Sequence, residues 1–368
     1  MRVPLLRLDF GDRETRALGE VLASGMLVQG ARVEAFEAAV KARTGRHHAV
    51  AVANGTAALE LALEALGIGP GDDVLCPDLT WPSPGHAILR RGARPVLVDV
   101  HADEWNAAPE ALAAARTAQT KAAIVVDQFG VPARWDALPG ALPGLALIED
   151  AACAIGSKLG NASAGAFGQV ACLSFHPRKV LTTGEGGMCL TDDDALDGKL
   201  RMLRNHGQQT PGEFVDAGGN ERLGELAAAL GLSQLGRLDA MIGDRLAQAT
   251  RYRAELPELA FQALPGGATW NAQTLGAVLP EPFDAARRDA LVRRLGELGV
   301  GAGRLSYALH ELPQFARAAN EARALGRSFP NAERLASRGV ALPCFPGMTN
   351  VEQAHVIEAV KRALLELR

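Results

Sequence analysis

A lysine and an aspartate stand where this sequence could build a reactive site. Lys179 lies in SFHPRKVLTTGEGG, between Ser174 and a glycine-rich turn that ends at Gly187. Asp150 ends the apolar run LALIED. A lysine held near a cationic ring can form a covalent bond with a carbonyl group, and a buried carboxylate needs a partner. These residue types suit a site for a cationic group that bears a carbonyl.

Two further features precede them in the chain. Asn54, Gly55 and Thr56 begin a predicted helix, where free N–H groups and the helix dipole bind anions and a glycine lets a phosphate approach closely. Trp81, in DLTWPSP, follows another apolar run, and its ring can stack on a planar group. Ser174 can donate to the same phosphate. Taken singly, each feature also has a simpler interpretation, such as a helix cap, a core tryptophan or an exposed lysine.

Together the features favour pyridoxal 5′-phosphate (PLP) bound through Lys179. They supply a phosphate cradle, a stacking ring, a carboxylate for the pyridine nitrogen and a lysine, in that order. Asp150 is preferred to Glu149 for the ring nitrogen because neighbouring strand residues face opposite sides of a sheet. The sequence contains neither GxxxxGK[ST] nor a GxGxxG after its first strand, which argues against a P-loop site and a nicotinamide oxidoreductase.

Short apolar runs separated by helical patterns predict the elements that position these residues. Such runs are typical of strands in a parallel sheet that helices cover on both faces. Ligands of such α/β sheets bind at the carboxyl ends of the strands, where the residues above fall. The predicted strands are Ala49–Ala53, Asp73–Pro77, Pro95–Val100, Ala122–Asp127, Leu145–Asp150, Val170–Phe175 and Gly187–Asp192.

The length of the chain, and the smaller number of predicted buried strands in its last third, predict three parts. Residues 1–30 are expected to form an N-terminal arm, residues 31–245 a large PLP-binding domain with a mainly parallel sheet, and residues 246–368 a smaller C-terminal α/β domain. Thr349 and Glu352 have the spacing of a capping box, which predicts the start of the last helix.

Composition narrows the function classes. A net charge of −4 without a basic face predicts no nucleic-acid partner. No apolar stretch reaches the roughly 18 residues of a membrane helix, and the charged N-terminus does not resemble a signal peptide, so we expect no membrane partner and a cytoplasmic location. The 5 cysteines lack a CxxC spacing and fit reduced thiols, and the 8 histidines lack HExxH, so no metal site is expected.

The sequence resembles the DegT/DnrJ/EryC1/StrS family of sugar aminotransferases over most of its length. The resemblance is carried by SGMLVQGARVEAFE, NGTAALELAL, GDDVLCPDLTWPSP, DQFGVPARWDAL, GGNERLGELAAALGLSQL and, most specifically, the run from IEDAA to GEGG. That family adopts the aspartate-aminotransferase fold, PLP fold type I, and places its active site at the interface of a dimer or larger assembly. The resemblance therefore implies a PLP-dependent transaminase and a homodimer.

The resemblance also implies roles for individual residues. Lys179 matches the Schiff-base lysine and Asp150 the partner of the pyridine nitrogen. Thr56 and Ser174 match phosphate contacts, and Trp81 matches the aromatic residue that stacks on the ring.

Further matches concern the edge of the site. Gly55 matches the phosphate turn, and Asn220, in GGNER, matches an asparagine that reaches the phosphate from the neighbouring subunit. Many members place glutamine or histidine three residues after the aspartate, where it can bond the cofactor's ring oxygen. Here that position is Cys153, whose thiol is a weak donor. Tyr307 and His310 lie in a stretch that resembles a substrate-side segment.

The implied reaction transfers an amino group from an amino acid, L-glutamate, to a nucleotide-linked keto sugar, as in amino-sugar biosynthesis for a surface polysaccharide or a secondary metabolite. Lys179 would move the proton as general base and acid. A keto-cyclitol acceptor, a PLP-dependent sugar dehydratase and a PLP-binding regulator without turnover remain as alternatives. The dehydratases have histidine in place of this lysine, so Lys179 argues against that alternative.

Overall fold

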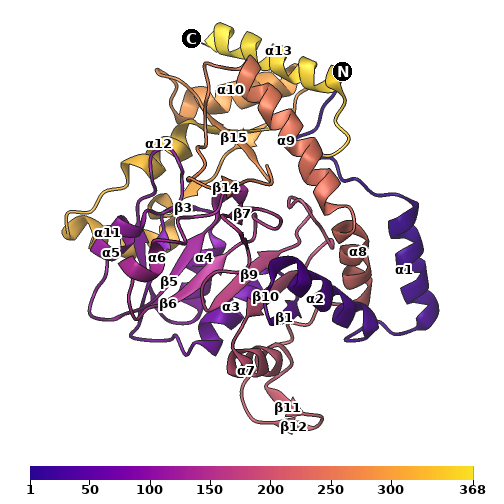
Figure 1. Ribbon diagram of the computed structural model, residues 1–368. Helices are drawn as coiled ribbons and strands as arrows, with labels where there is room; N and C mark the ends of the chain where they lie inside the picture. Colours follow the sequence, from indigo (N-terminus) through magenta and orange to yellow (C-terminus); the bar gives the residue numbers. More distant parts are fainter. Residues whose placement is uncertain (368) are drawn as a thin grey trace.

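A seven-stranded sheet lies at the centre of the computed structural model, which describes residues 1–367 (Figure 1). Its strand order is β1-β10-β9-β6-β5-β2-β4. The strands from β9 to β4 run parallel, and β10 is antiparallel to both of its neighbours. The predicted strands agree with the observed ones to within two residues at each end. The observed strands are β1 (His48–Val52), β2 (Asp73–Pro77), β4 (Arg94–Val98), β5 (Thr120–Val126), β6 (Ala146–Asp150), β9 (Val170–Ser174) and β10 (Gly187–Thr191).

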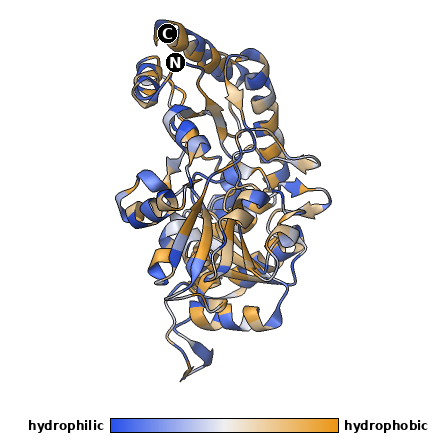
Figure 2. Cartoon of the chain, turned by 90° about the vertical axis from the view of Figure 1, so that its left-hand side faces the viewer, coloured by the Kyte–Doolittle hydropathy of each residue, from blue (hydrophilic) through white to orange (hydrophobic). Residues whose placement is uncertain are grey.

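Helices cover both faces of this sheet, so that its apolar strands lie inside the molecule (Figure 2). Strand side chains alternate between the faces. Ile148 packs in the core on one face of β6, whereas Leu147 packs in a core on the other. The first face is covered by α3 (Gly55–Ala65), α4 (Ser83–Arg90), α7 (Asp194–Arg204), α11 (Ala316–Ala324) and α12 (Pro330–Arg338). The second is covered by α2 (Ala31–Thr44), α5 (Pro109–Ala114), α6 (Leu138–Ala141), α8 (Glu225–Leu235) and the start of α9 (Leu238–Glu255).

A second, four-stranded sheet is formed by later residues in the order β13-β15-β18-β16. Its core is shared with the end of α9 and with α10 and α13. The predicted capping box is present, because Thr349 N donates to Glu352 Oε2 at 2.8 Å and Glu352 N donates to Thr349 Oγ1 at 3.1 Å. The elements are β13 (Ala260–Phe261), β15 (Leu275–Val278), α10 (Ala285–Glu297), β16 (Gly303–Arg304), β18 (Gly339–Leu342) and α13 (Asn350–Leu367).

The two sheets are linked by more than one connection. α9 runs through residue 245 without a break, and side chains from residues 305–336 join the core of the large sheet. Val3 N donates to Gly299 O at 2.8 Å, so the chain starts beside the second sheet (Figure 1). From there the first residues descend to α1 (Asp12–Ser24), which packs on α8. None of the helices within residues 1–367 is both long and apolar enough to cross a membrane.

Smaller elements decorate this frame. β3 (Leu79–Thr80) pairs with β17 (Tyr307–Ala308), and the hairpin of β11 (Gln208–Thr210) and β12 (Glu213–Phe214) projects from the body below α7 (Figure 1). The others are β7 (Lys158–Leu159), β8 (Ala162–Ser163), β14 (Ala268–Thr269) and three 3₁₀ turns, Gln128–Gly130, Leu309–Glu311 and Pro313–Phe315.

Candidate active site

The ends of several strands meet at one edge of the large sheet. Val52, at the end of β1, pairs with Gly187, and Gly187 pairs with Ser174 at the end of β9. On the far side of β9, Asp150 of β6 pairs with Cys172. The ends of β6 and β9 and the segments that follow β1, β6 and β9 therefore lie next to one another. They contain all of the sequence-predicted cofactor-site residues except Trp81 and Asn220.

Lys179 lies against Cys153 in this group. Its Nζ donates to Cys153 Sγ at 3.1 Å, and its backbone N donates to His176 O at 2.8 Å within a tight turn. Asn271, a fully buried residue, fixes the other partner by donating from Nδ2 to Cys153 O at 2.8 Å. The lysine and the thiol are thus both held by hydrogen-bonded backbone segments.

Asp150 is a buried carboxyl close to this lysine. Its Oδ1 accepts a hydrogen bond from Ala152 N at 3.1 Å, so it caps a turn after β6, where the simpler interpretation expected a helix. Burial raises the pKa of Asp150, and the bond from Ala152 and the charge of Lys179 oppose that rise. A permanent cation beside Asp150 would keep it ionised. The carboxyl therefore fits a protonated pyridine nitrogen.

The start of α3 approaches β9 so closely that only glycine fits. A Cβ on Gly55 would lie 2.8 Å from Ser174 Cβ. Asn54 caps the helix by accepting from Ala57 N at 2.9 Å, and Thr56 Oγ1 lies 2.8 Å from Ser83 Oγ. Two hydroxyl side chains and the start of a helix thus surround a place where a phosphate would be bound. Ser83 was not singled out from the sequence.

Trp81 is not a core residue, because it is 58% exposed. Its ring meets Tyr307 edge-on, with 5.7 Å between the ring centroids. Thr80, the neighbour of Trp81, pairs with Tyr307 in the β3–β17 ribbon. The aromatic pair therefore joins a loop of the large sheet to the segment that the sequence suggested for the substrate side.

Asp78 and His310 form a buried pair beneath that ribbon. His310 Nδ1 lies 2.6 Å from Asp78 Oδ2, and His310 N donates to Asp78 Oδ1 at 2.8 Å. The hydrogen bond to Asp78 raises the pKa of His310, whereas burial raises the pKa of Asp78 and His310 opposes that rise. Both shifts favour a proton held between the two side chains.

Asp127 and Glu149 form a second buried pair, on the face of the sheet opposite Asp150. Glu149 accepts from Gly165 N at 2.7 Å, as expected for a side chain that faces away from Asp150. Burial raises the pKa of both carboxyls. Within residues 1–367, Asp127 Oδ2 is buried without a hydrogen-bond donor, so it gains one when Glu149 carries a proton. Asp127 was not singled out from the sequence, although it ends an apolar run as Asp150 does.

Asn220 lies in an exposed segment between the β11–β12 hairpin and α8. Its Oδ1 accepts from Arg222 Nε at 3.0 Å, and its backbone pairs with Asn205. Glu221 O accepts from Ala53 N at 2.8 Å, which holds this segment beside the end of β1.

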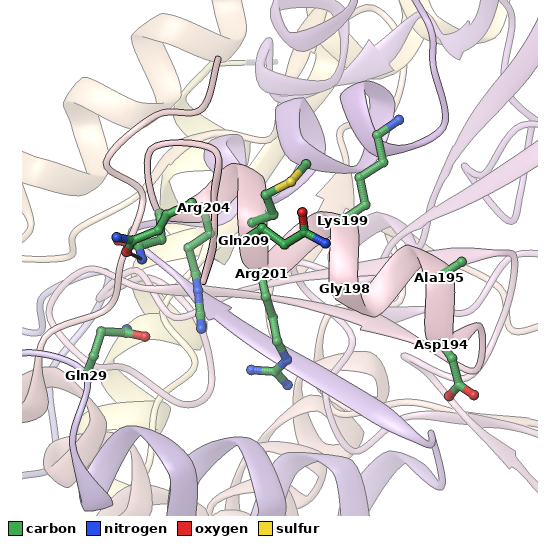
Figure 3. A pocket seen from close by; sticks show the side chains of 11 residues that line it. Gln29, Asp194, Ala195, Gly198, Lys199, Arg201, Arg204 and Gln209 are labelled. Atoms are coloured by element: carbon green, nitrogen blue, oxygen red, sulfur yellow. Dashed lines mark hydrogen bonds between the residues drawn. The ribbon is translucent and has the colours of Figure 1, made fainter. Parts of the chain in front are cut away.

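A cavity of about 600 Å³ opens beside α7 (Figure 3). Arg201 and Arg204 reach from α7 toward the same side of it, where both bind Glu37, at 3.0 and 2.8 Å. Their charges are therefore already matched by a carboxylate, and none of the predicted site residues lines this cavity. Within residues 1–367 no group of three or more His, Cys, Asp or Glu side chains is placed to hold a metal ion.

Comparison with known proteins agrees with this geometry. The profile of the DegT/DnrJ/EryC1/StrS aminotransferase family matches residues 9–361. The fold matches a protein described as a sugar aminotransferase from Streptococcus pneumoniae, in its pyridoxamine-phosphate form, with a TM-score of 0.93 at 23% identity over 100% of this chain and 98% of that one.

Two solved structures are more similar in sequence. The aminotransferase TlmJ from Streptoalloteichus hindustanus is 32% identical, with a TM-score of 0.90 and 100% of both chains covered. DesV of S. venezuelae, solved in complex with a ketimine intermediate, is 34% identical, with a TM-score of 0.88 over 95% of this chain and 94% of that one.

Proposed function

The chain belongs to the DegT/DnrJ/EryC1/StrS aminotransferase family, and from this premise we propose that it transfers an amino group from L-glutamate to a keto sugar linked to a nucleotide. As a member it is a PLP-dependent aminotransferase of fold type I. The observation that carries the proposal is the placement of Lys179 and Asp150 at one edge of the sheet, where the lysine charge acts on the buried carboxyl.

The residues at this edge fit PLP. Lys179 would hold the cofactor covalently, and Asp150 would bond its ring nitrogen. The start of α3, with Thr56 and Ser174, would bind the phosphate, since the close approach of Gly55 to Ser174 forms the cradle that such a group needs. When bound, PLP supplies an electron-withdrawing ring that makes the donor's Cα acidic.

The chain itself supplies proton transfer and orientation. The freed Nζ of Lys179 takes the proton from the donor's Cα as a general base and returns it as a general acid. With the cofactor bound, Asp150 would stay ionised beside the ring nitrogen and would keep that nitrogen protonated. Trp81, exposed and braced by Tyr307, would stack on the ring and fix its plane. Cys153 Sγ, which contacts Lys179 Nζ, would meet the ring oxygen.

We assign the acceptor to the same rim. Trp81 and Tyr307 present aromatic surface there, which suits a sugar ring or a nucleotide base. The relative from Streptococcus pneumoniae is described as a sugar aminotransferase, which supports a sugar as the acceptor class.

We further propose a homodimer in which Asn220 reaches the phosphate site of the partner subunit. In support, Asn220 is exposed and the nearby hairpin carries Phe214, which is 63% exposed. Met26, also in an exposed segment, is 56% exposed. Val215, next to Phe214, and Leu27 and Val28, next to Met26, are exposed as well, and groups of exposed apolar side chains are typical of protein–protein interfaces.

A mixing experiment tests the contribution of Asn220. We expect Asn220→Ala and Lys179→Ala chains to be weakly active or inactive alone and to regain activity when unfolded and refolded together. Only a shared site allows this, because the intact Lys179 of one chain would then meet the intact Asn220 of the other. If sedimentation shows that the mixed chains form a dimer but their activity does not recover, then Asn220 acts in the site of its own subunit.

The proposed reaction is tested by the visible absorption spectrum of the purified protein, before and after L-glutamate. We expect the band of the lysine-bound cofactor to bleach to that of pyridoxamine phosphate, and nucleotide-linked keto sugars to restore it. A bound cofactor that ignores L-glutamate would refute the donor. A bleached enzyme that no nucleotide-linked keto sugar restores, but that a free keto-cyclitol does, would refute the acceptor.

A further inference from the structure

The contact between Lys179 and Cys153 brings an amine and a thiol to reacting distance. The separation of 3.1 Å between Nζ and Sγ falls within the range of about 3–3.5 Å that near-attack geometries show. Both residues sit in hydrogen-bonded turns, and Asn271 anchors the backbone of Cys153 from a second segment. The two atoms therefore meet without rearrangement of the chain.

Cys153 also differs from every other cysteine of the protein. It is half-buried, whereas Cys76, Cys172, Cys189 and Cys344 are buried. Burial raises the pKa of the Cys76 and Cys172 thiols well above the usual value, which makes them poor nucleophiles. An oxidant that enters the site would meet Cys153 first.

We propose that Cys153 and Lys179 form an oxidation switch, in which a hydroperoxide converts the Cys153 thiol to a sulfenic acid and the free Lys179 amine then closes a covalent S–N cross-link. The cross-link itself requires only the two side chains. Its effect on activity rests on the proposed function, because it would remove the lysine that holds the cofactor.

The two steps balance with the peroxide as the oxidant. In the first, sulfur attacks a peroxide oxygen, the O–O bond breaks, and the departing hydroxide takes the thiol proton to become water. In the second, the nitrogen lone pair attacks sulfur, the S–O bond breaks, and the hydroxide takes a proton from nitrogen to become a second water. Sulfur loses two electrons and the peroxide gains them. An external thiol reverses the link by attacking sulfur and releasing the amine, and a second thiol then frees Cys153.

The state of the lysine decides whether the switch operates. While Lys179 is condensed with the cofactor, its nitrogen is bonded to carbon and cannot attack sulfur. In the cofactor-free chain, and after the amino group has passed to the cofactor, the amine is free. The switch would therefore act on the enzyme after it has taken the amino group from the donor and before it has bound the acceptor.

Mass spectrometry of peptides tests the proposal directly. The full-length chain is treated with hydrogen peroxide in three states: cofactor-free, cofactor-loaded, and loaded and then given L-glutamate. We expect a Cys153 peptide joined to a Lys179 peptide, lighter by two hydrogens than their sum, in the first and third states. The cofactor-loaded state should lack the joined peptides. In the other two states, dithiothreitol should separate the joined peptides and restore the Lys179 amine.

Two variants make the test specific. Lys179→Arg keeps a long cationic side chain that does not form the link, so its Cys153 should stop at the sulfenic acid and be captured by dimedone. Cys153→Ser should yield no joined pair, and the affinity of this variant for PLP should be the same before and after peroxide. Oxidation of wild-type Cys153 to sulfinic acid beside an unmodified Lys179 in the cofactor-free chain would overturn the proposal.

The two proposals can fail separately. A chain that forms the cross-link but never binds PLP would refute the assigned role of Lys179 and its control by oxidation, but not the cross-link itself. A chain that bleaches normally with L-glutamate but forms no cross-link would refute the switch alone.

Discussion

His310 Nδ1 lies 2.6 Å from Asp78 Oδ2, so a side chain from the second half of the chain is bonded within the large sheet's carboxyl edge. The same aspartate accepts from His310 N, and its own backbone oxygen accepts from Leu309 N at 2.7 Å. Three residues after Asp78 stands Trp81, whose ring is braced by Tyr307. The pair therefore ties the substrate-side segment to the residue proposed to stack on the cofactor.

Replacing His310 with glutamine should destabilise the fold and loosen this tie. Removing one partner of a buried charged hydrogen bond costs roughly 1.5–3 kcal/mol. Because the pKa of His310 is raised in the fold, its contribution is complete below the unfolded pKa of about 6.5 and is lost as pH rises through the folded value. Denaturant unfolding should show a larger deficit at pH 6 than at pH 9, with exposed His47→Gln as the control. An equal deficit at both values would contradict a shared proton.

Changing Lys179 to alanine should abolish turnover while leaving some cofactor binding. The phosphate cradle and Asp150 remain, but the covalent attachment and the general base are lost, and the base alone is worth about 100- to 10,000-fold. Equilibrium dialysis with PLP and a transamination assay would measure both effects. Turnover within tenfold of wild type would refute the role of Lys179.

Changing Asp150 to asparagine should weaken cofactor binding and slow the donor half-reaction. A hydrogen bond to a charged group contributes roughly 1.5–3 kcal/mol, so we expect about 10- to 100-fold weaker binding of PLP. The ring nitrogen would also lose its proton, which should slow bleaching by L-glutamate in stopped-flow measurements. Glu149→Gln, on the opposite face, provides a comparison, and an equal effect on bleaching would argue that Asp150 acts only through the fold.

Asp127→Asn should change the pH dependence of stability. Burial raises the pKa of Asp127 and Glu149 in the fold, so their contribution is complete below the unfolded values near 4 and is lost as pH rises through the folded ones. An amide at position 127 can donate a hydrogen bond to an ionised Glu149, so the variant should not lose this stabilisation as pH rises. The free energy of unfolding should therefore fall less between pH 5 and pH 8 than in wild type. Exposed Asp136→Asn should leave the wild-type slope, and the same slope in Asp127→Asn would exclude the shared proton.

Gly55→Ala tests the phosphate cradle. The added Cβ would lie 2.8 Å from Ser174 Cβ, and relieving that clash should cost about 1–3 kcal/mol and move the start of α3. We expect weaker binding of PLP, and of inorganic phosphate as its competitor. Gly243→Ala, in α9 with open space around the glycine, should bind PLP like wild type. If Gly55→Ala binds PLP with the affinity of wild type, the phosphate does not bind at the start of α3.

The sequence determined the elements and the chemical types at their ends. Apolar runs such as LALIED indicate buried strands because a strand covered on both faces is apolar over most of its length, and the end of this run placed Asp150 at a strand end. Two of the simpler local interpretations were wrong: Trp81 is exposed and not a core residue, and Lys179 is half-buried and not exposed. Aromatic residues serve cores and binding sites equally well, so residue type did not distinguish the two.

Only the tertiary structure decided which of these residues meet. Asp78 and His310 are separated by 232 positions, and Lys179 and Cys153 by 26, yet each pair is in contact. Such contacts follow from strand order and domain packing, which leave no periodic pattern in the chain. The Asp127 carboxyl is likewise an ordinary strand-end aspartate by sequence, and it becomes a proton-sharing group only because β5 and β6 place it beside Glu149 where water is excluded.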